Sequence, residues 1–194
     1  MNKTLLALCV LFIVSLAHAD ESLDKMFSEL QSPQTATKAV EKWETAARHD
    51  AVARAYLAAH LPALIEQDPR LQPEVWTTAV KLAGNLALQA AAPALAHWIG
   101  LNTGGTTTFA QYERLENNLP AKALVQIGDP AVPAVRDALE QGNLRQREIA
   151  IRTLKLIGTE IATAALRAHL AREPDQRLRK MILQSIGGNI SGPA

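Results

Sequence analysis

The chain has 194 residues with 20 basic and 19 acidic side chains, so its formal net charge is +1, and 48% of its residues are hydrophobic. This balance argues against a protein that binds nucleic acid by bulk electrostatic attraction, and the length suits a single domain with a real core. The only cysteine is Cys9, which excludes a disulfide framework and a zinc site built from several cysteines.

The first element along the chain is predicted to be a secretory signal peptide in residues 1–19. Lys3 gives it a positive start, residues 4–16 form an apolar run, and Ala17-His18-Ala19 has the small-x-small pattern of a cleavage site. The apolar run is shorter than the roughly 20 residues of a membrane-spanning helix. We therefore expect a mature chain of residues 20–194, without a membrane span, that is periplasmic or secreted. An uncleaved anchor is the alternative.

The rest of the chain is predicted to be all-α. Apolar residues recur every three or four positions, and no long stretch alternates with period two. In residues 144–157 this spacing puts Ile149, Ile151 and Leu154 on one broad face, with Arg152 and Lys155 opposite. Glycine and proline turn signals divide the pattern into helices near 22–31, 34–47, 50–60, 62–67, 73–84, 89–99, 109–127, 131–140, 144–157, 160–171 and 175–186.

Repetition is the most informative feature of the helical region. Four glycines end helices at corresponding points, and each is preceded at four positions by an aliphatic residue: Val80 before Gly84, Leu124 before Gly128, Leu154 before Gly158 and Leu183 before Gly187. A second short motif also repeats. It reads "PAL", "PAL", "PAV" and "AAL" and starts at positions 62, 93, 133 and 164, at intervals of 31, 40 and 31 residues. A period near 30 that contains two short helices predicts a right-handed α-solenoid of stacked antiparallel helix pairs.

The stretch "IGDPAVPAVRDALEQGN…RQREIAIRTLKLIG" resembles the HEAT repeat, in the short variety found in phycocyanobilin-lyase-type HEAT-like proteins. The resemblance is clear in residues 109–187 and weak in residues 50–99, and it implies about four units behind N-terminal capping helices in residues 20–49. Arg147 matches the arginine that the family places eleven residues before the terminal glycine, where it usually bonds within its own repeat. The other units have Pro73, Asn117 and Gln176 at that position.

The 40-residue interval points to an inserted loop, "GLNTGGTTT", in residues 100–108. Its nine residues account for the difference from the neighbouring intervals. Insertions in repeat proteins form loops on one face, often the binding face. We expect Asn102 and Thr106 to supply hydrogen-bonding groups for a partner; a solvated spacer is the alternative.

Basic residues concentrate in two predicted helices near the C-terminus. Arg145, Arg152 and Lys155 lie in residues 144–157, and Arg179 and Lys180 lie in residues 175–186. In HEAT-like proteins the second helix of each pair lines the concave surface, so the resemblance implies a positive groove that would receive an acidic segment of a protein or peptide partner. An ordinary solvated face is the alternative.

No cofactor, metal site or catalytic residue is predicted. The histidines form no His-x-x-x-His pair, and no serine lies in a Gly-x-Ser-x-Gly or Ser-x-x-Lys motif. We therefore expect an exported, non-catalytic scaffold or adaptor that binds a protein or peptide. The alternatives are a lyase-type or cofactor-handling enzyme component and a structural subunit of an envelope assembly. The sequence leaves the oligomeric state open.

Overall fold

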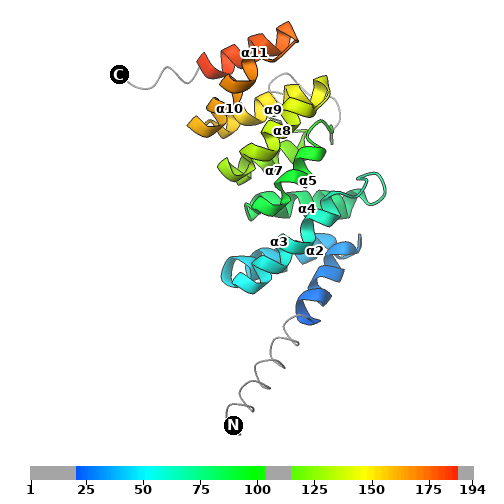
Figure 1. Ribbon diagram of the computed structural model, residues 1–194. Helices are drawn as coiled ribbons and strands as arrows, with labels where there is room; N and C mark the ends of the chain where they lie inside the picture. Colours follow the sequence, from blue (N-terminus) through cyan, green and yellow to red (C-terminus); the bar gives the residue numbers. More distant parts are fainter. Residues whose placement is uncertain (1–20, 104–114, 188–194) are drawn as a thin grey trace, which may run out of the picture.

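A computed structural model describes residues 21–103 and 115–187, and these residues form helices without a strand. The predicted signal peptide lies outside the described residues. Residues 21–31 are helical and lead into the chain of helices in Figure 1. In chain order these are α2 (Ala36–His49), α3 (Ala51–Ile65), α4 (Pro73–Asn85), η1 (Gln89–Ala91), α5 (Ala92–His97), α7 (Leu119–Ile127), η2 (Asp129–Ala131), α8 (Val132–Gln141), α9 (Leu144–Ile157), α10 (Glu160–Leu170) and α11 (Gln176–Gly187).

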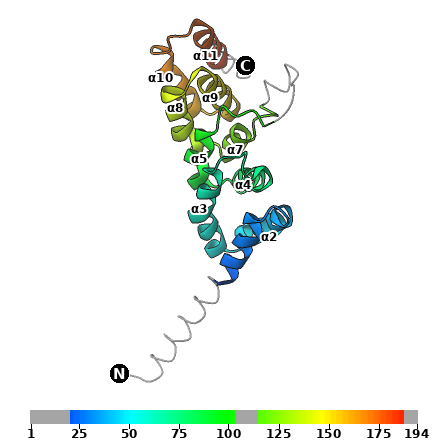
Figure 2. The same cartoon turned by 90° about the vertical axis from the view of Figure 1, so that its right-hand side faces the viewer.

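The helices alternate between two layers. Helices α2, α4, α7, α9 and α11 contact one another in succession and form one layer, called here the α9 layer. Helices α3, α5, α8 and α10 do the same on the other side and form the α8 layer. Figure 2 shows both layers edge-on. This arrangement confirms the predicted all-α solenoid of stacked helix pairs, and α2 with α3 already follows it.

One continuous core runs between the two layers. Leucine, isoleucine, valine and alanine supply most of it because each helix has its apolar residues on the side that meets its neighbours. At the N-terminal end an aromatic cluster closes the stack. Trp43 is fully buried, stacks on Tyr56 and meets the edge of Phe27, and its Nε1 donates to the Met26 carbonyl at 3.1 Å.

Turn residues set the limits of the repeats. Gly128 and Gly158 have positive φ values of 77° and 71°, which favour glycine. The Thr159 hydroxyl caps α10 by accepting from the Ala162 amide, and it donates to the Asp129 carboxylate in the equivalent turn of the preceding repeat. Gly84 instead allows α4 and α7 to pack closely, because a Cβ there would lie 3.0 Å from the Cα of Ala123 in α7. The prediction that Gly84 ends a helix is wrong, because α4 continues to Asn85.

Two predicted helix boundaries are also wrong. Helix α3 continues through Pro62 to Ile65, although the sequence predicts a break near that proline. A proline three residues before the end of a helix removes only one internal hydrogen bond, and the packed core compensates for it. The predicted helix 109–127 is not continuous, because residues 115–118 are not helical and Asn118, which accepts from the Ala121 amide, caps α7 at Leu119; residues 109–114 lie outside the described residues.

Buried ion pairs join α9, α10 and α11. Glu173 is 1% exposed; its Oε1 lies 3.3 Å from Arg147 Nη2 and accepts from the Asp175 amide at 3.0 Å, while its Oε2 lies 2.9 Å from His169 Nε2. Nearby, the buried Glu148 pairs with Arg152 at 3.4 Å and with Arg177 at 2.9 Å. Carboxylates buried in this way need their partners, because an isolated buried charge is very costly.

Candidate functional site

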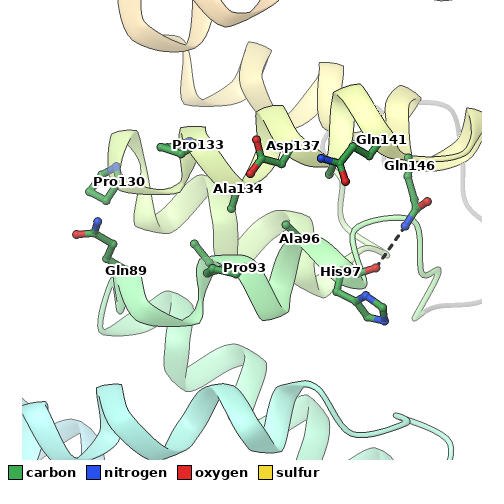
Figure 3. A pocket seen from close by; sticks show the side chains of 13 residues that line it. Gln89, Pro93, Ala96, His97, Pro130, Pro133, Ala134, Asp137, Gln141 and Gln146 are labelled. Carbon is green, nitrogen blue, oxygen red and sulfur yellow. Dashed lines mark hydrogen bonds between the residues drawn. The ribbon is translucent and has the colours of Figure 1, made fainter.

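A groove of about 530 Å³ lies between α5 and α8, on the outer side of the α8 layer. Figure 3 shows Gln89 and Pro130 at one end of this groove and His97 with Gln146 at the other. We call it the α5–α8 groove. It is lined by Gln89, Ala92, Pro93, Ala96, His97, Pro130, Pro133, Ala134, Asp137, Ala138, Gln141, Gly142 and Gln146.

The groove exists because small residues line both helices. Packed helices have their axes about 8–10 Å apart, and larger side chains normally fill the space between the ridges. Here α5 contributes Ala92 and Ala96 to the lining, and α8 contributes Ala134 and Ala138. A methyl group cannot fill this space, so a hollow with an apolar floor remains. The prolines at the starts of the two helices, Pro93 and Pro133, extend this floor.

Polar side chains stand along the rim of this apolar floor. Gln89, Asp137 and Gln141 are exposed, and within the described residues neither glutamine side chain has a hydrogen-bond partner. Gln146 is held in place, because its Nε2 donates to the His97 carbonyl at 3.4 Å and its Oε1 accepts from the Asn143 amide at 3.0 Å. The groove therefore combines a fixed end with two amides that are free to bind.

A smaller hollow of about 370 Å³ adjoins this end and shares His97 and Gln146 with the groove. Its other lining residues are Trp98, Gly100, Leu101, Asn143 and Arg145. Arg145, one of the predicted partner-binding residues, is thus exposed beside the α5–α8 groove.

The predicted insertion begins next to this hollow. The described residues before residue 104 are joined to those after residue 114, because the Thr103 amide donates to the Asn117 carbonyl at 2.9 Å and Asn118 Nδ2 donates to the Ile99 carbonyl at 2.7 Å. Asn102 is exposed there. Thr106 lies outside the described residues, so its predicted role stays a prediction.

One residue of the predicted positive groove lies inside the helix stack. Arg152 is buried and faces Glu148, so it cannot belong to a partner surface, and the prediction is wrong for this residue. The helical pattern put Arg152 opposite the apolar face, but α9 is packed on most sides and buries that position too. Lys155, Arg179 and Lys180 are exposed, although Arg179 also donates to the carbonyl oxygens of Leu170 and Glu173.

Arg147 does not have the role that the resemblance implied, a bond within its own repeat. It reaches Glu173 in the connection between α10 and α11, which form the next helix pair. The residue is therefore structural. It ties α9 to the turn that leads into α11.

The groove was not predicted from the sequence, because the candidate residues were placed on the second helices of the repeats and in the inserted loop. The groove lies instead between two first helices, α5 and α8. The signal was present as the repeated small residues in "APALA" and "VPAVRDALEQ", where alanines and prolines occupy the positions at which the two helices face each other.

Neither electrostatics nor metal-ligand geometry suggests another site in the described part of the chain. There, no group of three His, Cys, Asp or Glu side chains is placed to hold a metal ion. The Asp68 carboxyl accepts three hydrogen bonds from the Arg70 guanidinium, which lower its pKa to about 2, but this pair lies in the exposed turn between α3 and α4. Within the same residues, no helix is long and apolar enough to span a membrane.

Comparison with known proteins identifies the repeat. Residues 120–187, which run from the second residue of α7 to the end of α11, match the family model for HEAT repeats. HEAT repeats generally serve as scaffolds that mediate protein interactions. Searches of curated proteins and of solved structures found no match.

Proposed function

We propose that this chain, whose residues 120–187 consist of HEAT repeats, is an exported, non-catalytic scaffold that binds another protein through the α5–α8 groove. The observation that carries the proposal is the groove itself, a hollow with an apolar floor and a polar rim on a solenoid surface. Grooves of this composition bind by burying apolar groups, while a few polar side chains fix the orientation of the ligand.

The dimensions favour an extended segment of the partner. Helix α8 has 10 residues, so the groove beside it is about 15 Å long, which matches four or five residues of extended chain. The free amides of Gln89 and Gln141 each offer both donors and an acceptor to a peptide backbone. Asp137 adds a carboxylate acceptor between them (Figure 3). An extended segment with small apolar side chains satisfies all of these groups.

Filling the groove tests the proposal. Ala134→Trp puts a large ring on the groove floor, and we expect it to weaken the binding of a captured partner at least about tenfold, which corresponds to 1.4 kcal/mol. The matched control is Ala168→Trp, an exposed position on α10 in the same layer. The measurement is quantitative pull-down from an envelope extract of the native cells. Equal capture by both variants would contradict a role of the groove.

Export is tested separately. We expect the chain to be found in the periplasmic or secreted fraction, with Asp20 as its first residue after cleavage behind Ala19. Cell fractionation followed by N-terminal sequencing measures both. Protein that stays in the cytoplasm and begins at Met1 would contradict export without affecting the groove.

A further inference from the structure

The outer end of the α9 layer has a surface that differs from every earlier position in the repeat. Helix α11 is the last helix that the structure describes, and its residues can be compared with those of α4, α7 and α9 by counting back from the repeat glycines. Four positions before those glycines, Val80, Leu124 and Leu154 are at most 1% exposed. The equivalent Leu183 is 54% exposed. The same repeat position is therefore buried in three units and exposed to solvent in the fourth.

The residues next to Leu183 are exposed cations, whereas the equivalent residues of the earlier helices are buried. Eight positions before the glycine, the earlier helices have Trp76, Pro120 and Ala150, all buried, whereas α11 has the exposed Arg179. Next to it, the exposed Lys180 stands where α9 has the fully buried Ile151. These two cations precede Leu183 by four and three residues, so both are its neighbours on the helix surface.

The charge on this face is not compensated. Helix α11 contains three cations and no acidic residue. Arg177 pairs with Glu148 behind the helix, but within the described residues Arg179 contacts only carbonyl oxygens and Lys180 has no ion pair. A helix that only closes a stack has a polar outer face throughout. Here a leucine at a core position is retained beside two cations that have no carboxylate partner within the described residues.

We propose that this end face of α11, with Leu183 between Arg179 and Lys180, docks an amphipathic helix of a partner protein whose apolar residues are flanked by Asp or Glu. The repeat geometry makes a helix the fitting element, because every equivalent position in the stack is covered by the next helix. The cations require acidic flanks. A second copy of α11 would instead bring like charges together. The proposal does not depend on what the α5–α8 groove binds.

The test uses the full chain in the cells that naturally make it. A photo-cross-linking residue, p-benzoylphenylalanine, replaces Leu183, and the same residue at Leu71 is the control, because Leu71 is 77% exposed but lies in the turn between α3 and α4. After illumination, mass spectrometry maps the cross-linked segment. We expect cross-links from position 183 to an acidic, helix-forming segment of another protein, and none from position 71.

Charge reversal provides the second readout. Lys180→Glu is expected to reduce the yield of the cross-link from position 183 about tenfold, while Lys81→Glu, an exposed lysine on α4 in the same layer, leaves it unchanged. Lys180 makes no bond that the described fold needs, so the variant keeps its structure. The proposal is overturned by equal yields in the two variants, or by cross-links that map to a second copy, to residues 188–194 of the same chain, to a basic or neutral segment, or to nothing.

Discussion

Replacement of Glu173 by alanine is expected to lower the free energy of unfolding by about 3–5 kcal/mol. The carboxylate is buried, and it is the common partner of Arg147, His169 and the Asp175 amide. Its removal leaves the Arg147 guanidinium, only 21% exposed, and a buried imidazole without the group that they face. For a chain of this size the melting temperature should fall by roughly 6–20 °C.

Urea unfolding followed by circular dichroism measures this loss. The matched control is Glu140→Ala, which removes a carboxylate that also pairs with an arginine, Arg172 at 3.0 Å, but at the surface. Surface pairs contribute about 0–1 kcal/mol, so this variant should be close to the unchanged protein. Similar losses in the two variants would show that the Glu173 pairs do not hold the C-terminal helices together.

Trp43→Ala is expected to cost about 3–5 kcal/mol at the opposite end of the stack. The indole is fully buried, packs against Phe27 and Tyr56, and donates a hydrogen bond to Met26, so the substitution opens a large cavity and leaves a carbonyl without its donor. The contacts connect residues 21–31 to α2 and α3. The N-terminal helices should therefore unfold together.

The same unfolding measurement applies, with Leu71→Ala as the control because Leu71 is largely exposed. This control should change stability by no more than about 0.5 kcal/mol. Hydrogen exchange should also accelerate first in residues 21–65 of the Trp43 variant. A loss of stability without faster exchange in this region would contradict the proposed role of the aromatic cluster.

Most of the fold could be predicted because a solenoid depends on local patterns. The helix 144–157 has the predicted bounds: the Asn143–Gln146 capping box fixes its start, and Gly158, in the left-handed conformation, fixes its end. The continuation of α3 through Pro62 and the start of α7 were less predictable. Tertiary packing decides whether a proline near a helix end breaks the helix, and the Asn118 side chain, rather than apolar spacing, marks the start of α7.

The candidate site was harder to predict than the fold. Arg152 looks like a surface residue because one helix read alone has a solvent side, whereas α9 is enclosed by helices of both layers. The α5–α8 groove depends on which alanines of two helices meet across about 40 residues of sequence. The exposure of Leu183 depends on whether another helix packs over α11. In all three cases the decisive information is the position of neighbouring helices.

The most direct test of the account is the hydrogen-exchange footprint of the captured partner. Exchange is measured on the full chain alone and in the complex recovered from the native envelope. The account predicts slower exchange in residues 89–97 and 130–142, which line the α5–α8 groove, and loss of this protection in Ala134→Trp. Protection confined to residues 21–85, or protection of the groove that persists in Ala134→Trp, would contradict the claim that the protein binds its partner there.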